Sequence, residues 1–494
     1  MKRLHKKACC GRCEEALIGV VREQSEPPHV GCYGERQGFV LVAVLVIIML
    51  TSMVALSLLF RIKAEDTAVA AGAGSEQAWS AAMSGVYEAM RIASAVTPED
   101  TDWQDNPGLF HQRLVLDDGL DQWQFSIYSY RETEEGSFHF GLQDEASKLN
   151  LHTASEAMLT RLPGMTPYLA QGLLDFLDKD DVPHPQGAEQ EYYDNLPRPY
   201  ACLNGPLSTI YELFLVRGFN PGVVYGEDSN LNCALDTHEN DGDDFPPPDN
   251  GDSKLDPGLR HYATICSYDL DEDNDGQIRL DLNDSAETFW NVELPGPVVE
   301  YINSARTNKI KFKHPAELLE AKTKLPNGKE IVSGVGKAEL PLLLDKFSGS
   351  LDYHLHGLIN VNTASAAVLQ TLPGVDESLA QNIVATRKGL RAEQRKTPAW
   401  LYEESILDAP KFKQLAPLLT TRSRQFTFQV IGYGVPSGRY RVLEVMIDVA
   451  GAEPAVTYLR DITRLGLPFV IEPEAKETLT TYHRSATKEV AHGG

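Results

Sequence analysis

Asn150-Leu-His-Thr-Ala-Ser155 and Asn360-Val-Asn-Thr-Ala-Ser365 are two copies of one sequence unit. The same offset separates Leu162-Pro-Gly164 from Leu372-Pro-Gly374, so each copy continues into a Pro-Gly turn. In each copy, Thr or Ser residues that can cap a helix precede the turn, and leucines at helical spacing lie on both sides of it. The pattern predicts two helix-hairpin-helix repeats, at residues 149–180 and 359–390.

A helix-hairpin-helix motif often grips a nucleic-acid phosphate with the backbone N–H groups of a hairpin that contains two glycines. The hairpins here read Pro163-Gly-Met-Thr166 and Pro373-Gly-Val-Asp376, and neither has the second glycine. Asp376 would also point a carboxylate toward a phosphate, and the net charge of -25 opposes binding to a phosphate backbone. We therefore expect the repeats to pack or to contact protein partners, with no nucleic acid as a partner. A DNA-uptake receptor is the least favoured alternative.

The segment Phe39–Phe60 is apolar except for Thr51, Ser52 and Ser57, and its length of roughly 20 residues suffices to cross a membrane as a helix. A secretory signal peptide would have a shorter apolar region followed by a small-residue cleavage site. Here an alanine-rich helical pattern continues to about Ala95. The segment therefore predicts a retained single-pass membrane helix.

Strand patterns occur at the two ends of the remaining chain. They lie at residues 123–130 and 137–140 and, near the carboxyl end, at residues 425–431, 440–447 and 457–462. The helical repeats lie between these two groups. The predicted fold class is α+β, with a long N-terminal helix on a small antiparallel sheet and a large, mainly α-helical domain inserted between its strands.

Carboxylates are concentrated in an acidic loop predicted for residues 226–284, which has too little apolar content in its first part to form a core. Within it, Asp271-Glu-Asp-Asn-Asp275-Gly276 alternates carboxylates before a glycine, as a calcium loop does. Leu282 stands where an EF-hand has its bidentate glutamate, so Asp281, Asp284 or a distant group would have to close the site.

A second candidate calcium site consists of the acidic residues that follow the first repeat: Asp178, Asp180, Asp181 and Glu189. The alternative for the residues near Asp271 is a solvated acidic turn. For the second group it is a set of helix caps or exposed side chains. In either place Ca²⁺ would be structural, because it would fasten long loops.

No nucleophile with a base, no carboxylate pair in a cleft and no open metal site can be recognised, so we expect no enzymatic activity. The histidines His152, His184, His354 and His356 are isolated or lie on turns. We expect each of them to be an ordinary surface or core histidine.

Two stretches resemble known families. Arg36-Gln-Gly38 before Phe39-Val-Leu-Val42 is similar to a type IV prepilin processing site, with cleavage after Gly38 and Phe39 as the first mature residue. Most pilins have a glutamate at the fifth mature position, where this chain has Ala43. The run Asp178–Tyr193, continued by Val216-Arg-Gly-Phe219, resembles the signature of the general secretion pathway protein K family, a minor pseudopilin of type II secretion.

This resemblance implies a pilin-like fold and a subunit at the tip of the pseudopilus that initiates its assembly. The implied partners are the I- and J-type minor pseudopilins, the major pseudopilin and the prepilin peptidase. The implied location is the inner membrane, as a single-pass protein whose C-terminal domain lies in the periplasm, with calcium in the inserted domain. A minor pilin of a type IV pilus is the alternative, but it would usually keep the glutamate and lack the insertion.

The predicted domains follow from these features. They are a prepilin leader at 1–38, the transmembrane part of the helix at 39–60, the rest of the helix and the first strands at 61–141, the inserted domain at 142–420, the last strands at 421–465 and a tail at 466–494.

Overall fold

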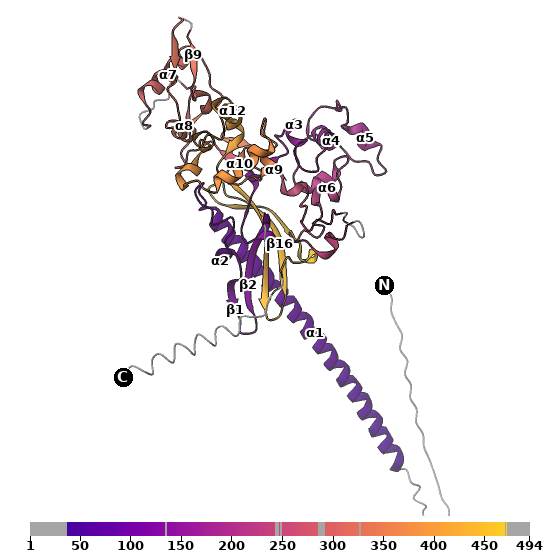
Figure 1. The fold of residues 1–494 in the computed structure, drawn as a ribbon. Coiled ribbons are helices and arrows are strands. Elements are labelled where there is room, and N and C mark those ends of the chain that lie inside the picture. Colours follow the sequence, from indigo (N-terminus) through magenta and orange to yellow (C-terminus); the bar gives the residue numbers. More distant parts are fainter. Residues whose placement is uncertain are drawn as a thin grey trace, which may run out of the picture. The chain divides into compact units, whose positions relative to one another are not determined.

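The structure is a computed structural model of the 494-residue chain, shown in Figure 1. It describes residues 37–133, 136–242, 247, 249–284, 292–325, 328–469 and 471. The chain is divided into two compact units, Met1–Val69 and Ala70–Gly494. The predicted leader is therefore described only at residues 37 and 38. Part of the predicted acidic loop, and the tail beyond residue 471, lie outside the described residues.

The first unit contains the beginning of helix α1 (Gln37–Ala93). Large apolar side chains from Phe39 to Ile62 are exposed along it, and within the described residues α1 is the one helix long and apolar enough to cross a membrane. The hydroxyl of Thr51 donates to the carbonyl of Ile47 at 2.9 Å, so this polar group is satisfied within the helix. The sequence-based prediction of an apolar helix over residues 39–60 agrees with this geometry.

In the second unit, the later part of α1 packs on a β-sheet through small side chains. Ala82, Val86 and Ala89 are fully buried in a core shared with the sheet. A Cβ atom at Gly432 of the sheet would overlap the backbone of Ala78 and Ala82. The helix and the sheet therefore approach closely because neither side has bulky residues at this contact.

The main sheet of the described residues has the strand order β1-β2-β15-β16-β17, in which neighbouring strands are antiparallel. Strand β3 pairs with β2, and β4 pairs with β15. The strands are β1 (Arg113–Asp117), β2 (Gln122–Thr133), β3 (Gly136–His139), β4 (Gln143–Asp144), β15 (Gln425–Val435), β16 (Tyr440–Asp448) and β17 (Ala455–Asp461). Helix α2 (Pro107–Phe110) precedes β1.

Five of these strands, β2, β3, β15, β16 and β17, correspond to the strand patterns in the sequence. Strand β1 was not expected. All five of its residues are exposed at the sheet edge, so it has no alternation of buried and exposed positions to reveal it.

Both faces of the sheet are buried. Phe426, Phe428 and Val430 of β15 face the core that contains α1, while Ile431 and Tyr433 contribute to a second core on the other face. Apolar residues after β17, from Leu465 to Ile471, pack against this second core. The start of the predicted tail is therefore part of the fold.

The segment from Glu145 to Arg424 is inserted between β4 and β15 (Figure 1). A large hydrophobic core lies within this segment. Its helices are α3 (Glu156–Leu159), α4 (Pro167–Leu177), α5 (Gln190–Asp194), α6 (Pro221–Tyr225), α7 (Gly296–Thr307), α8 (Leu340–Lys346), α9 (Ala366–Leu369), α10 (Glu377–Arg387), α11 (Trp400–Glu403) and α12 (Ala409–Leu415). Its strands are β5 (Leu149–Asn150), β6 (Ala263–Thr264), β7 (Tyr268–Leu270), β8 (Leu280–Asp281), β9 (Lys322–Lys324), β10 (Glu330–Val332), β11 (Phe347–Ser348), β12 (His354–His356), β13 (Ile359–Asn360) and β14 (Leu419–Thr420). Short strand pairs thus separate short helices, so the insertion is less uniformly helical than expected.

The two sequence repeats form the helix pairs α3–α4 and α9–α10. Each pair is preceded by a two-residue strand, β5 or β13, that pairs in parallel with a later strand, β6 or β14. The amide of Asn150 donates to the carbonyl of Ser267 at 3.1 Å, and that of Asn360 donates to the Ser423 hydroxyl at 3.0 Å. The repeated unit is therefore a helix pair together with a closing strand, which is larger than the sequence repeat.

The hairpins of both repeats turn at a glycine with positive φ, Gly164 (73°) or Gly374 (70°). The Asp376 carboxylate accepts the backbone N–H of Leu379 at 2.9 Å and so caps α10. This carboxylate stabilises the hairpin from within, which agrees with the expected packing role of the repeat.

Candidate metal site

The loop between α4 and α5 collects acidic side chains that follow the first repeat. Helix α4 ends at Leu177, and the N–H of the next residue, Asp178, still bonds to the carbonyl of Leu174 at 2.9 Å. Asp178 Oδ1 then accepts the N–H of Asp180 at 3.3 Å, and Asp180 Oδ1 accepts the N–H of Val182 at 2.9 Å. These side-chain-to-backbone bonds are typical of aspartate turns, and they fix the path of the loop.

Asp175, on α4, anchors the far side of this loop from a fully buried position. Both of its oxygens accept the backbone N–H of His184 at 3.2 Å, and the His184 ring nitrogen Nδ1 contacts the same carboxylate. This contact raises the pKa of His184 above its ordinary value. Gly187 packs so closely that a Cβ atom there would overlap the Asp175 carboxylate.

Arg217 holds the loop from outside. Its Nη1 donates to the carbonyl of Gly187 at 2.6 Å, and its Nε donates to the Tyr168 hydroxyl at 3.0 Å. The guanidinium group lies over the rings of Tyr168 and Tyr192, at 5.0 and 4.7 Å from their centroids. This packing explains why the sequence stretch that contains the acidic run also contains the arginine.

Glu189, the residue before α5, is the least satisfied of the acidic side chains. It is 6% exposed, and neither of its carboxylate oxygens has a hydrogen-bond partner among the described residues. Burial, together with the charges of Asp175, Asp178, Asp181 and Asp180, raises its pKa to about 7. A buried carboxylate among carboxylates is costly unless a proton or a cation neutralises it.

The ligand atoms of Asp178, Asp180 and Glu189 lie within 4.8 Å of one another, as do those of Asp175, Asp178 and His184. Carboxylate oxygens are the donors that Ca²⁺ prefers. The unpartnered oxygens of Glu189 are an observation independent of the acidic composition. This donor set therefore fits a hard divalent cation.

The other predicted calcium site has a different environment. Asp271 lies 3.4 Å from Arg279 Nη1, and Asp273 and Asp275 lie 2.9 and 2.6 Å from Lys346 Nζ. These carboxylates therefore already face positive charges supplied by the chain.

The proposed closing residues of that site do not complete it. Asp281 Oδ1 accepts the N–H of Asn283 at 2.7 Å, and Leu282 is fully buried. In the part of the chain that the structure describes, the ligand atoms of Asp271, Asp273, Asp275, Asp281 and Asp284 do not converge as a group. The five carboxylates therefore do not form one ligand set among the described residues.

Sequence reasoning missed Asp175, His184 and Lys346. Asp175 precedes Asp178 by three residues on a helix, a spacing that places both side chains on one face, so that signal was present. His184 was expected to be an ordinary histidine. Lys346 is far from Asp273 in the sequence, and no local pattern connects them.

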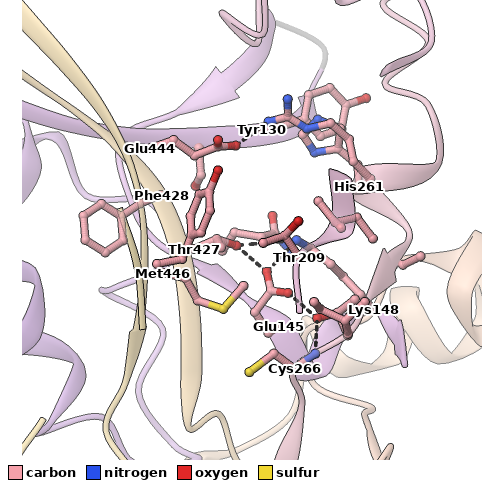
Figure 2. Close-up of a pocket in the computed structure, with 18 of the residues that line it drawn as sticks. Tyr130, Glu145, Lys148, Thr209, His261, Cys266, Thr427, Phe428, Glu444 and Met446 are labelled. Carbon is pink, nitrogen blue, oxygen red and sulfur yellow. Dashed lines mark hydrogen bonds and ion pairs between the residues drawn. The ribbon is translucent and has the colours of Figure 1, made fainter. Parts of the chain in front are cut away.

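A cavity of about 170 Å³ lies between the sheet and the inserted segment (Figure 2). Glu145, which is 2% exposed, accepts hydrogen bonds there from Lys148 Nζ and the Thr264 hydroxyl, both at 2.5 Å, and from the Thr427 hydroxyl. Thr427 belongs to β15 and Glu145 to the first turn of the insertion, so this network ties the insertion to the sheet.

Three polar atoms that line this cavity have no hydrogen-bond partner among the described residues: Arg260 Nη1, His261 Nε2 and Gln429 Oε1. They include a donor and an acceptor, and the cavity has room for ordered water that would bridge them. These unpartnered atoms lie at the junction between the sheet and the inserted segment.

Comparisons with known proteins bear on the acidic loop directly. Residues 142–225, which include Asp175, Glu189 and Arg217, match the family described as type II secretion system (T2SS), protein K. This stretch of the chain is therefore similar to the type II secretion system protein K family. Residues 356–420 match the helix-hairpin-helix motif, which agrees with the second predicted repeat.

One matching solved structure is a chain of the GspK-GspI-GspJ complex of the enterotoxigenic Escherichia coli type 2 secretion system. It is 13% identical to this chain, and the match covers 81% of this chain and 99% of that chain with a TM-score of 0.36. That score is too low to establish a common overall arrangement. No protein with a curated description matches this chain.

Proposed function

We propose that this chain is the K-type minor pseudopilin of a type II secretion system, and that it sits at the pseudopilus tip and initiates assembly. The match of residues 142–225 to the protein K family supports this role. The role is structural: the chain would hold other subunits together in the inner membrane and in the periplasm.

The observation that carries the proposal is the change of environment along α1. Its apolar residues from Phe39 to Ile62 are exposed, whereas Ala82, Val86 and Ala89 are buried against the sheet. An exposed apolar helix must be covered by lipid or by other apolar helices. A helix with one exposed apolar part and one part packed on a sheet suits a pilin-like subunit. Such a subunit enters the membrane and then joins the corresponding helices of the I- and J-type minor pseudopilins and the major pseudopilin.

The insertion supports the position at the tip. Most residues from Ala70 onward belong to the segment between β4 and β15 rather than to the sheet itself. A filament subunit that carries so much additional mass leaves little room for another subunit above it. We therefore propose that the insertion ends the filament on the periplasmic side.

The first step in this scheme is processing by the prepilin peptidase between Gly38 and Phe39. Helix α1 begins at Gln37, so the proposed cleavage site lies in its first turn. Ala43 stands at the fifth mature position, where subunits of the filament body usually have a carboxylate. The absence of this carboxylate agrees with a position of the subunit outside the filament body.

We also propose that Asp178, Asp180 and Glu189 hold a structural Ca²⁺ ion, with Asp181 contributing negative charge nearby. The buried and unpartnered Glu189 oxygens support this assignment. The bound ion would neutralise the cluster, and the chain's own Asp175, His184 and Arg217 would hold the loop in place.

The processing step can be tested with the variant Gly38→Leu expressed in place of the native chain. We expect the leader to remain attached, visible as a larger mass of the membrane-inserted chain, and secretion through the system to be lost. Gly72→Ala is the matched control, because a Cβ atom at Gly72 has open space in the same helix. Normal secretion with an uncleaved Gly38→Leu chain would contradict the proposed function.

A further inference from the structure

The loop from Asp271 to Gly276 is a tight hairpin whose backbone is closed by its own hydrogen bonds. The N–H of Asp273 donates to the carbonyl of Gln277 at 2.7 Å, and Gly276 has a positive φ of 74°. Asp273 Oδ1 accepts the N–H groups of Asp275 at 2.9 Å and Gln277 at 2.8 Å. One oxygen of Asp273 is thus already used by the turn.

The other oxygen of Asp273 faces the ammonium group of Lys346, the last residue of α8. Lys346 Nζ lies 2.9 Å from Asp273 Oδ2, 2.6 Å from Asp275 Oδ2 and 3.4 Å from Asp345 Oδ2. The lysine side chain is 23% exposed and the Asp273 side chain 9%, so the Lys346–Asp273 contact is largely protected from water. Three carboxylates therefore converge on one cation that belongs to the chain.

The backbone oxygens around the hairpin also have donors. Arg422 Nη1 donates to the carbonyls of Glu272 at 2.6 Å and Asp273 at 3.2 Å, and its Nη2 donates to that of Leu270 at 2.6 Å. Arg279 Nη1 lies beside Asp271 Oδ1 at 3.4 Å. A calcium ion requires six to eight oxygen ligands, and here the carbonyl oxygens of Leu270, Glu272 and Asp273 face N–H groups of Arg422 instead.

We propose that the Lys346 ammonium is the permanent cation of the Asp271–Gly276 hairpin, which therefore folds without a metal ion and binds no calcium. The lysine occupies the place between Asp273 and Asp275 where a divalent ion would be held. An ion brought to these carboxylates would also be repelled by the ammonium at short range. This inference does not rest on calcium binding at Glu189.

The test is the number of calcium ions bound per full-length chain in detergent, measured by equilibrium dialysis with radioactive calcium at about 1 mM, the range of extracellular calcium modules. We expect Asp275→Asn to leave the number unchanged. Asp275 is 76% exposed, so this substitution is compatible with folding. We expect Lys346→Met to raise the number by one, because Asp273, Asp275 and Asp345 would then lose their common ammonium.

Lys388→Met, at an exposed lysine outside the hairpin, is the control and should change nothing. Loss of one ion in Asp275→Asn would overturn the inference, and so would an unchanged number in Lys346→Met. A wild-type chain that binds no calcium would contradict the site at Glu189, whereas the gain in Lys346→Met would still test the hairpin. The two proposals can therefore fail separately.

Discussion

Glu189 has two buried, unpartnered oxygens close to Asp178 and Asp180, and the free energy of this arrangement depends on what neutralises it. In chelator at neutral pH, we expect Glu189→Gln to raise the melting temperature, because the substitution removes one of several repelling charges. With about 1 mM calcium the order should reverse, since an ion that binds only the folded chain with an affinity in the extracellular range stabilises it by about 0.4–1.4 kcal/mol. Thermal unfolding of the full chain in chelator and in calcium measures both effects.

Glu191→Gln provides the control, because Glu191 is exposed two residues away. It should unfold like the wild type in both buffers. Equal calcium stabilisation of wild type and Glu189→Gln would remove Glu189 from the proposed site.

His139 gives the fold a dependence on pH. Its ring is 6% exposed, Nε2 contacts the Ser129 hydroxyl at 3.1 Å, and burial together with the charge of Arg131 lowers its pKa to about 3. The His139 ring takes up a proton near pH 6.5 in the unfolded chain but not in the folded chain. The free energy of unfolding therefore has its full value at neutral pH and falls as the pH drops below 6.5. At pH 5 the loss from this one group is about 2 kcal/mol.

We expect His139→Gln, which keeps a polar nitrogen near Ser129, to lose about 2 kcal/mol less than the wild type between pH 7.5 and pH 5. The measurement is chemical unfolding at the two pH values. His354→Gln, at an exposed histidine, should leave the pH dependence unchanged. An identical pH dependence in His139→Gln and the wild type would show that the pKa of His139 is the same in the folded and the unfolded chain.

Among the elements, the contact between α1 and β15 depends on the absence of side chains. A Cβ atom at Gly432 would overlap backbone atoms of Ala78 and Ala82, which cannot rotate away as a side chain could. We expect Gly432→Ala to cost at least about 3 kcal/mol, at the upper end of overpacking effects. In contrast, Gly72→Ala in α1 should be neutral or stabilise by up to about 1 kcal/mol through helix propensity.

Unfolding curves of the two alanine variants provide the comparison. Equal stability of Gly432→Ala and the wild type would mean that α1 does not pack on the sheet at this point. Because both substitutions add one methyl group, the difference between them reports the contact rather than the residue type.

The sequence predicts elements well where the signal is local. The apolar segment, the two Pro-Gly hairpins and the strand β15 all have short-range patterns, and each corresponds to an element of the structure. The pattern fails where the partner is distant in the chain. Lys346 beside Asp273, and strand β6 beside β5, are brought together only by the folded insertion.

The same reasoning explains the two outcomes for acidic residues. Around Glu189 the acidic residues lie within one loop, so their composition already indicates a cluster. Around Asp271 the composition resembles a calcium loop, but the chain supplies cations from Arg279, Lys346 and Arg422, which composition near the loop does not reveal. A cluster of acidic residues in the sequence therefore indicates a cation site only when the folded chain supplies no basic side chains to pair with it.

For the whole molecule, the question is whether α1 only anchors the chain or also assembles with other subunits. A chimera in which residues 39–60 are replaced by an unrelated single-pass helix of equal length separates these roles. The chimera keeps the packed part of α1, where Ala82 and Val86 are buried, so the fold of the unit Ala70–Gly494 should be preserved. Membrane insertion should also be preserved, because length and apolar composition suffice for it.

We expect the chimera to lose co-purification with the I- and J-type minor pseudopilins in detergent and to abolish secretion, because helices associate in lipid through specific packing rather than through general apolarity. The wild-type chain, expressed at the same level with the same partners, should yield a complex whose mass includes all three subunits. If the chimera assembles and secretes like the wild type, α1 is an ordinary anchor. The exposed face from Phe39 to Ile62 would then be covered by lipid alone, and the site of assembly would have to lie in the unit Ala70–Gly494.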